Sequence, residues 1–518
     1  MSDIKRILMI AAENDALPGA KVGGVGDVIR DLPAALIKQD AAVDVVLPSY
    51  GFLARLNNLE NVGTVAVKFS SQLFHVNVLV LKGGQGRADN YILHHPAFAP
   101  LGETVYCNDS DSRPFATDAT KFALFCSSVA QALVEDVLPR PDVLHCHDWH
   151  AAFLLILIRF GMEYRSLTDI KTIFTIHNLA LQGIRPFRGD DSAFVTWFPD
   201  LRYSIDKISD PRYGDCVNPM RAGILLADRI HTVSPSYAQE IINSSHHELG
   251  IYGGDGLEHD IRERMERGDV IGILNGCEYP ENVESKSLSR TKLAGLMREW
   301  LRRWAAKNVT LKSAHWLAED NISHWLEKKS SGFTVMSVGR LTEQKIRVLH
   351  TKLKDGRSAL QGLLDVLGGS GTMVFLGSGS TDLEKFFTEA SAENRNLIFL
   401  NGYSDAVSSA LYKFGDLFLM PSSFEPCGIS QMLAMRSGQP CLVNSVGGLK
   451  DTVIPNKNGF AFEGRTINDQ AEAMVVLFTE AITLYKNSKV IWGSMKQQAA
   501  KARFTWEASA KRYMEELY

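Results

Sequence analysis

The amino-acid sequence predicts an α/β protein built from two doubly wound parallel sheets, and three observations lead to this prediction. The chain has 518 residues, which is too long for one ordinary core because a domain holds on the order of 150 residues. Short β-rich runs alternate with helical patterns, as in parallel βαβ units. The alternation stops near Gly276 and resumes at Phe333. We therefore expect an N-terminal domain over residues 1–276, a C-terminal domain over 277–490 and a final helix over 491–518.

The first domain opens with the run KRILMIAA, a helical stretch at 25–39 and the run VDVVLPSY. Three later apolar runs, IFTIHN, ADRIHTVS and DVIGILNG, each end in small or polar residues. Doubly wound sheets bind their ligands outside the carboxyl ends of the strands. These strand ends are therefore the first candidates for a functional site.

The second domain follows a charged, tryptophan-containing region at 277–332, which we expect to be mostly helical. The strand FTVMSVGR then opens a second series, which continues with TMVFLGSG, NLIFLNGY, DLFLMPSS and PCLVNSVGG. We expect one polar helix over 347–362, and the spacing of apolar residues predicts further helix from Val490 onward.

Composition narrows the class of protein. The longest apolar run, Ala151–Ile158, is far short of the roughly 20 residues that span a bilayer. The first apolar stretch runs into Glu13 without a cleavage-like site, so we expect a cytoplasmic protein that does not bind membranes. Seven cysteines without a CxxC pair indicate reduced thiols rather than disulfides or a zinc site. A net charge of −4 with both signs interspersed gives no reason to expect nucleic acid as a partner.

A glycine-rich turn, KVGGVGDV, connects the first strand to the first helix. Glycines allow a ligand to approach the backbone closely, and the N-terminus of the following helix attracts anions. Lys21 adds a cation, so a phosphate or an activated sugar would fit here. The turn lacks the GxGxxG spacing, and a purely steric role for its glycines remains an equal alternative.

The segment VLHCHDWHA ends another strand, on which alternation places His145 and His147 on one face. We reject a metal site because the ligand spacings of zinc sites are absent, and we expect hydrogen-bonded histidines instead. Asp148 and Trp149 are interpreted as an acid and an apolar plate for a sugar, and His177 in TIHN is a second polar candidate.

Two turns of the second domain carry charged candidates. In SVGRLTEQK, Arg340 and Lys345 could neutralise a diphosphate leaving group. A solvated surface pair is an equally good interpretation of that spacing. In SSFEPCGISQ, Glu425 could accept hydrogen bonds from sugar hydroxyls while the amides from Gly428 onward face the ligand. Alternatively, Glu425 only caps the next helix and Cys427 is a small buried residue.

Taken in order, KVGGVGDV, HDWHA, TIHN, VSPSYA, GRLTEQK, FEPCG and GGLKDTV resemble the motifs of bacterial glycogen synthases and plant starch synthases. The resemblance implies the GT-B fold, in which two Rossmann-like domains face a deep cleft and a C-terminal helix returns to the N-terminal domain. It implies transfer of glucose from ADP-glucose to an α-1,4-glucan such as glycogen, with retention of configuration. Acceptor and glucose contacts would come mainly from the first domain, and the second would hold the nucleotide.

The resemblance also implies roles for individual residues. A first group would hold the glucose or the departing phosphates and carry the chemistry: His177, Asp148, Glu425, Arg340 and Lys345. A second group would bind the substrates: Lys21, Gly23, Gly24, Asp27, Trp149, Asn178, Asn275, Gly377, Tyr403, Cys427, Gly428, Gly447, Gly448 and Leu449. Within it, Asp27 would support the glycine-rich turn and Tyr403 would lie near the base.

The chemistry requires fixed positive charge, because breaking the bond from glucose C1 to phosphate leaves a negative diphosphate. Side-chain cations and helix amides could supply that charge, and no DxD motif suggests a metal site. We expect activity without a metal or any other cofactor.

The sequence departs from the family pattern at three places. Ile346 replaces the usual glycine, Ser423 replaces the usual arginine, and the stretch after Gly276 lacks the usual Trp-Asn-Pro segment. Two alternatives therefore stay open. One is a related enzyme that uses UDP-glucose or another acceptor, and the other is a catalytically impaired regulatory paralogue.

Overall fold

The computed structural model describes residues 5–279, 288–307 and 311–518. The chain divides into two compact units, each of the α/β class. Unit 1 comprises Met1–Ser245, Gly253–Gly276 and Trp506–Tyr518, and unit 2 comprises His246–Tyr252 and Cys277–Thr505. The chain thus enters the larger part of unit 2 between Gly276 and Cys277.

Unit 1 contains a nine-stranded sheet in the order β11-β10-β7-β6-β1-β2-β5-β4-β3. The strands from β11 to β5 run parallel, whereas β3 and β4 pair antiparallel with each other and β4 with β5. The strands are β1 (Arg6–Ile10), β2 (Ala42–Pro48), β3 (Leu59–Phe69), β4 (Gln72–Leu81), β5 (Asp89–His94), β6 (Val143–His147), β7 (Lys171–Ile176), β10 (Arg229–Thr232) and β11 (Val270–Gly272). The central strands are mostly buried and rich in apolar residues, because helices cover both faces of a doubly wound sheet. The antiparallel edge was not predicted from the sequence.

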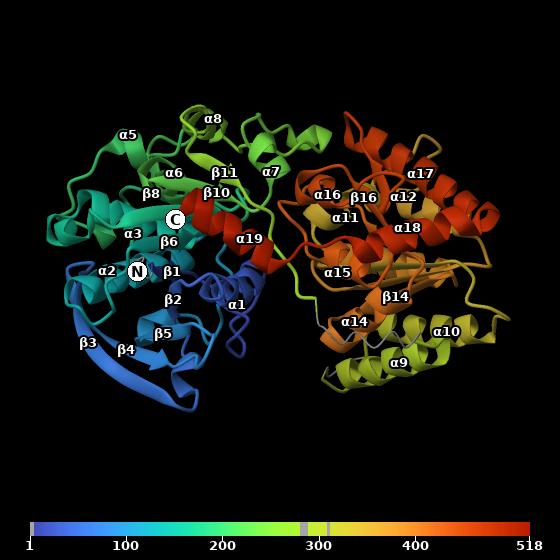
Figure 1. Ribbon diagram of the computed structural model, residues 1–518, viewed down its shortest axis with the longest axis horizontal. Helices are drawn as coiled ribbons and strands as arrows, with labels where there is room; N and C mark the ends of the chain where they lie inside the picture. The colour runs from blue at the N-terminus through green and yellow to red at the C-terminus, as the bar shows by residue number, and fades with distance from the viewer. Residues whose placement is uncertain (1–4, 280–287, 308–310) are drawn as a thin grey trace. The chain divides into compact units, whose positions relative to one another are not determined.

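The helices of unit 1 include two packed groups, one of which contains α19 from the C-terminal segment. Helix α3 contacts both α2 and α6, and α19 lies against α1 (Figure 1). The helices are α1 (Gly24–Ile37), α2 (Ala116–Val134), α3 (Asp148–Phe160), α4 (Phe194–Trp197), α5 (Ile205–Ile208), α6 (Pro219–Leu226), α7 (Pro235–Glu240), α8 (Glu258–Glu266) and α19 (Trp506–Arg512), with a small two-stranded sheet of β8 (Arg185–Pro186) and β9 (Cys216–Val217).

Unit 2 contains a six-stranded parallel sheet in the order β14-β13-β12-β15-β16-β17. Its strands are β12 (Thr334–Val338), β13 (Thr372–Gly377), β14 (Leu397–Asn401), β15 (Leu417–Met420), β16 (Cys441–Asn444) and β17 (Gly459–Phe462). Its helices are α9 (Arg290–Lys307), α10 (Ser313–Glu327), α11 (Glu343–His350), α12 (Ala359–Leu367), α13 (Thr381–Glu393), α14 (Asp405–Phe414), α15 (Ser430–Arg436), α16 (Gly447–Thr452), α17 (Ile467–Asn487) and α18 (Lys489–Lys501). Helices α9 and α10 confirm the expected helical character of this region over its described residues.

The single helix expected over 347–362 is wrong. Helix α11 ends at His350, and α12 begins only at Ala359. Between them Gly356 has a φ of 87°, which glycine adopts without strain. The Ser358 side chain then caps α12 by accepting a hydrogen bond from the backbone of Gln361. A turn with its own capping residue therefore interrupts the polar stretch.

The C-terminal segment that joins unit 1 is shorter than the expected 491–518. Trp492 and Met495, in α18, are buried in the core of unit 2, where the Trp492 ring lies 5.6 Å from the ring of Phe333. Only Trp506–Tyr518 belongs to unit 1. Burial of two large apolar side chains thus keeps α18 with unit 2.

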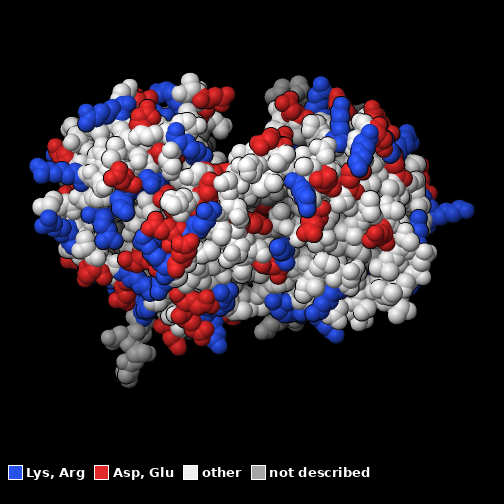
Figure 2. All heavy atoms as spheres, turned by 90° about the horizontal axis from the view of Figure 1, so that it is seen from above, with Lys and Arg blue, Asp and Glu red and all other residues white. Residues whose placement is uncertain are grey.

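The described part of the chain contains no helix that is long and apolar enough to cross a membrane. On the face seen in Figure 2, basic and acidic side chains are interspersed over the surface.

Candidate functional site

Most sequence candidates of unit 1 lie at the carboxyl ends of three neighbouring parallel strands, β1, β6 and β7, and Asn275 follows β11. Asp148 follows β6 and His177 follows β7. One carboxylate oxygen of Asp148 accepts hydrogen bonds from the backbone N–H of His177 at 2.7 Å and of Asn178 at 3.4 Å. The structure therefore brings these three predicted residues together.

The Asp148 carboxyl group is buried, and burial raises its pKa to about 7 although the two backbone hydrogen bonds oppose the shift. Its backbone adopts a φ of 56°, which is uncommon for residues other than glycine. A carboxyl group that titrates near neutral pH at a strand end is a candidate for ligand contact.

The glycine-rich turn is held by a residue that the sequence analysis did not select. The buried Glu13 accepts hydrogen bonds from the backbone N–H groups of Val22 at 2.7 Å and Gly23 at 2.5 Å. Its second oxygen accepts a hydrogen bond from the Tyr106 hydroxyl at 2.8 Å. An acidic residue directly after a buried strand was the available signal for Glu13, whereas nothing in the sequence connected Tyr106 to this turn.

Lys21 lies in a small network of charges beside that turn. Its ammonium group contacts Asp27 at 2.7 Å and Asp15 at 3.1 Å, and Arg30 pairs with the same two carboxylates. Partial burial lowers the pKa of Lys21, but the hydrogen bonds and charges of the two carboxylates outweigh it and raise the pKa above its ordinary value. Lys21 therefore stays protonated, and Asp27 orients it.

The glycines of the site separate into two kinds. A Cβ atom added at Gly24 would meet no atom within 4 Å, so the fold itself leaves open space at the N-terminus of α1. At Gly377, Gly447 and Gly448 an added Cβ would overlap backbone oxygens of neighbouring turns. Close backbone packing therefore requires glycine at these three positions, while Gly24 has the space that a ligand needs.

His145 is a hydrogen-bonded core residue, as expected. Its two ring nitrogens contact the hydroxyl groups of Thr175 and Tyr518, each at 2.6 Å. Thr175 also contacts His231 at 3.0 Å. Burial lowers the pKa of His145 to about 3, so the ring is neutral.

The expectation that Trp149 offers an apolar plate to a sugar is wrong. Its side chain is only 2% exposed, and its ring packs against Phe115 and Phe122. Gly183 lies directly over the ring, where a Cβ atom would clash with it. Because Trp149 falls on the inward face of α3, it supports the site from the core.

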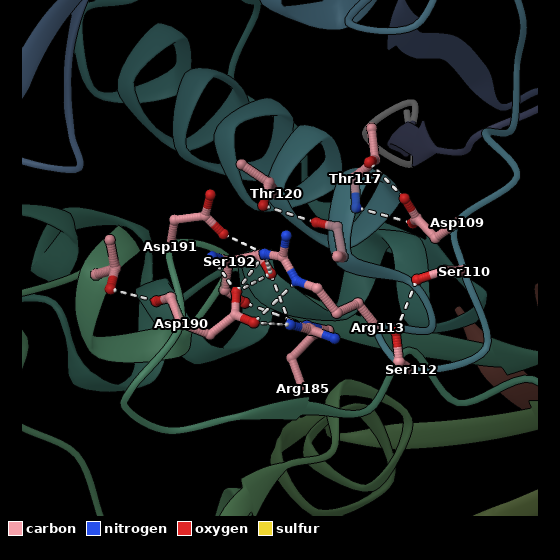
Figure 3. Close-up of polar contacts among 12 residues, drawn as sticks. Asp109, Ser110, Ser112, Arg113, Thr117, Thr120, Arg185, Asp190, Asp191 and Ser192 are labelled. Carbon is pink, nitrogen blue, oxygen red and sulfur yellow. Dashed lines mark hydrogen bonds and ion pairs between the residues drawn. The ribbon is translucent and has the colours of Figure 1, made fainter.

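A second polar network joins two loops of unit 1, one before α2 and one after β7 (Figure 3). Arg113 donates to Asp190 at 2.6 Å, and the buried Arg185 pairs with the same carboxylate at 3.1 Å. Hydrogen bonding from Arg113 holds the pKa of Asp190 below its ordinary value. Arg185 also donates to the Ser192 hydroxyl at 2.6 Å. The two loops are therefore fixed to each other by charge.

Asn275 lies three residues beyond β11 and is buried. Its side-chain oxygen has no hydrogen-bond partner among the described residues. A buried acceptor without a partner is unusual, and it leaves Asn275 a candidate for ligand contact.

In unit 2, an ion pair joins the turns that follow the neighbouring strands β12 and β15. Lys345, in the first turn of α11, forms an ion pair with Glu425, whose same oxygen accepts a hydrogen bond from Ser422 at 3.0 Å. Glu425 is 5% exposed and makes no capping contact to α15. The capping interpretation of Glu425 and the solvated interpretation of Lys345 are therefore both excluded. Arg340 is exposed.

Several further candidates of unit 2 lie in or against the turn that carries Glu425. Gly428 has a φ of 73°, and the backbone N–H of Gly448 donates to the Glu425 carbonyl at 3.1 Å. The side chains of Cys427 and Leu449 are buried. These two residues can therefore contribute to a ligand site only through their backbone.

Tyr403 follows β14, and its side chain is 56% exposed. Its hydroxyl donates to Asp405 at 2.7 Å. The ring of Trp304, from α9, covers the adjacent Gly402 so closely that a Cβ atom there would lie 2.7 Å from it. The helical region before β12 thus supports the turn that carries Tyr403.

Both substitutions within the unit 2 turns are accommodated by the fold. Ile346 is 1% exposed and belongs to the core of unit 2, so its side chain points away from the turn. Ser423 donates from its backbone N–H and its hydroxyl to the carbonyl of Gln344, at 2.9 and 3.1 Å. Ser423 therefore ties the Glu425 turn to the Lys345 turn. The third departure lies largely at 280–287, outside the described residues.

A short segment from the N-terminal half of the sequence completes unit 2. Within His246–Tyr252, the carbonyl of His247 accepts a hydrogen bond from Arg347 at 2.6 Å. The ring of Tyr252 stacks on Phe424 at 5.4 Å. The segment therefore packs beside the turns of Lys345 and Glu425.

Comparisons with known proteins agree with this architecture. The family model "Starch synthase catalytic domain" matches residues 6–263, and "Glycosyl transferases group 1" matches residues 319–489. The glycogen synthase of Streptococcus gordonii is 33% identical over 98% of both chains, and that of Photobacterium profundum is 28% identical over 98% of this chain and 94% of the relative. The catalytic domain of starch synthase IV from Arabidopsis thaliana, solved with ADP and acarbose, superposes with a TM-score of 0.76 at 26% identity over 99% of both chains. A sucrose-phosphate synthase from Thermosynechococcus elongatus shares the fold, with a TM-score of 0.54 at 14% identity over 99% of this chain and 98% of that one.

Two α/β units with mainly parallel sheets and polar strand ends, together with the matching family model and solved structure, define a GT-B glycosyltransferase. The chain belongs to the glycogen synthase and starch synthase family and is a glucosyltransferase.

Proposed function

We propose that this protein transfers glucose from ADP-glucose to the non-reducing end of an α-1,4-glucan, with retention of configuration and without a metal, in the cytoplasm. Asp148 and His177 hold the transferred glucose, and Lys21 and Gly24 line its phosphate side. Arg340 and Lys345 bind the departing diphosphate. The ADP and acarbose bound to the related starch synthase IV domain support a donor with an adenine base and a glucan-like acceptor.

The observation that carries the proposal is the ion pair of Lys345 with the buried Glu425. A carboxylate that is 5% exposed and a paired ammonium group form a charged site at a strand end. When a nucleotide sugar binds, Lys345 turns to the diphosphate and Glu425 accepts hydrogen bonds from glucose hydroxyls. The pair thus holds both charges ready before the donor arrives.

The experiment is diphosphate release with glycogen as acceptor and either ADP-glucose or UDP-glucose as donor. We expect ADP release to be far faster, and EDTA to leave the rate unchanged. Faster UDP release would change the assigned donor. Inactivity with both donors would overturn the assignment and favour a regulatory glucan-binding protein.

A further inference from the structure

His147 and His177 form a buried pair at the ends of two neighbouring strands. His147 closes β6, and His177 follows β7. The Nδ1 atom of His147 lies 2.9 Å from the Nε2 atom of His177. The two side chains are 1% and 8% exposed. One of these two nitrogens must therefore carry the hydrogen of the bond, and the other must accept it.

The hydrogen count of the pair is fixed because both rings are neutral. Burial lowers the pKa of His177 to about 3 and lowers the pKa of His147 well below its ordinary value. A neutral imidazole carries one hydrogen, on either nitrogen. The bond therefore allows two arrangements, which differ in where each ring places its hydrogen.

The surroundings of His147 distinguish the two arrangements. Its Nε2 atom is buried and has no hydrogen-bond partner among the described residues. The neighbouring His145 stacks on His147 with ring centres 4.1 Å apart, but both of its nitrogens already contact hydroxyl groups. If His177 donated through Nε2, His147 would carry its hydrogen on Nε2 as a buried N–H without a partner. Such groups are rarer in proteins than acceptors without a partner.

We propose that His147 is a positioning residue, which donates through Nδ1 to Nε2 of His177 and so fixes the hydrogen of His177 on Nδ1. The inference rests on the proposed function only in taking His177 as a contact of the transferred glucose. No described residue bonds to Nδ1 of His177, so its hydrogen is available to a sugar hydroxyl oxygen. A neutral donor suits this place, because the glucose ring becomes positively charged in the transition state and a second cation beside it would be unfavourable.

Nitrogen-15 labelling of histidine tests the hydrogen position in the resting protein. Two-bond proton–nitrogen spectra distinguish the two tautomers, and a His177→Gln spectrum identifies the signals of His177. We expect His177 to carry its hydrogen on Nδ1 in the unmodified protein. A His177 signal with the hydrogen on Nε2 would overturn the proposal.

Two variants connect the tautomer to turnover. His147→Asn keeps a possible N–H donor near the Nδ1 position, whereas His147→Asp offers only acceptors there. We expect the Asn variant to keep the tautomer and to stay within about threefold of the original kcat, and the Asp variant to move the hydrogen to Nε2 and lower kcat at least about tenfold. Equal losses in both variants with an unchanged tautomer would overturn the proposal. If neither nucleotide sugar is a substrate while the Nδ1 hydrogen is observed, the proposed function fails and the inference about His147 stands.

Discussion

Lys345 and Glu425 are the residues of unit 2 whose charge the proposed chemistry uses most directly. We expect Lys345→Ala and Glu425→Ala each to lower kcat by at least about 100-fold, because each removes a main electrostatic contact of the reaction. Lys385→Ala is a matched control, since Lys385 forms a loose 3.7 Å pair with Glu389 and both side chains are exposed. Unchanged turnover in both site variants, measured by diphosphate release, would refute the assignment.

Gly24 tests whether the glycine-rich turn serves a ligand or only the fold. Because an added Cβ meets no atom there, Gly24→Ala should keep the thermal midpoint and raise the donor KM at least about tenfold, as a methyl group intruding on bound phosphate would. Gly448→Ala is the contrasting variant, because its Cβ would overlap the Cys427 carbonyl. It should lower the thermal midpoint. An unchanged donor KM in Gly24→Ala would show that this glycine has no role in binding.

Asp148 should make stability depend on pH. Its pKa in the folded protein is about 7, above its ordinary value of 3.8. Between these values the folded protein binds a proton that the unfolded chain has released, so stability falls as pH rises through this window. The loss from this group reaches about 4 kcal/mol at full effect.

Asp148→Asn cannot titrate, so its urea midpoint should change less between pH 4 and pH 8 than that of the original protein. Burial raises the pKa of Asp44 to about 6, but Asp44 is present in both proteins and does not affect the difference. Parallel profiles for the two proteins would contradict the pKa of Asp148.

At the residue scale, the sequence predicted the polar residues at the strand ends but not the side chains that hold those turns in place. Asp148, His177, Lys345 and Glu425 follow directly from apolar runs that end in polar residues. The bond from Tyr106 to Glu13 spans 93 positions, and no local pattern encodes such a contact. The sequence also did not reveal that the Trp149 side chain is buried, because the start of a helix does not show which face packs against the core.

At the scale of elements, α9 supports the turn that carries Tyr403, the residue proposed to lie near the base. Its Trp304 lies on Gly402, so Trp304→Ala would leave a void beneath the turn that carries Tyr403. We expect the KM for the nucleotide sugar to rise about fivefold to tenfold, equivalent to roughly 1 kcal/mol, with little change in kcat.

Trp316→Ala provides the control for α9, because Trp316 in the adjacent α10 is 69% exposed. It should leave both kinetic constants unchanged. Equal effects of the two substitutions, measured with ADP-glucose and glycogen, would show that Trp304 does not act through this turn.

The parallel strands were predictable, and the antiparallel edge was not. Strands such as β15 are buried along their whole length and form continuous apolar runs in the sequence. In β3 only the last five residues alternate between buried and exposed positions, after a mostly exposed beginning. Because the alternation of buried and exposed residues is short and a bulge lies between Asn61 and Gly63, the sequence pattern did not predict this strand.

At the scale of the whole molecule, the final segment is a structural part of unit 1. Trp506 is 5% exposed and donates from its ring N–H to Asp31 at 3.1 Å. Because removing a buried Trp side chain costs about 3–5 kcal/mol, Trp506→Ala should increase hydrogen exchange in unit 1 peptides from β6, β7 and β10. Peptides from β12 to β15 should exchange as before. A uniform increase over both units would show that the segment does not stabilise unit 1 selectively.

The chain passes between the two units four times, after Ser245, Tyr252, Gly276 and Thr505. This threading limits how relatives can be recombined. In a chimera with a single junction at Gly276, residues 246–252 of one parent would pack against unit 2 of the other parent. Residues 506–518 of the second parent would likewise pack against unit 1 of the first. Exchange of the whole of unit 2 between two relatives therefore requires the transfer of 246–252 together with 277–505, while 506–518 stays with its original parent.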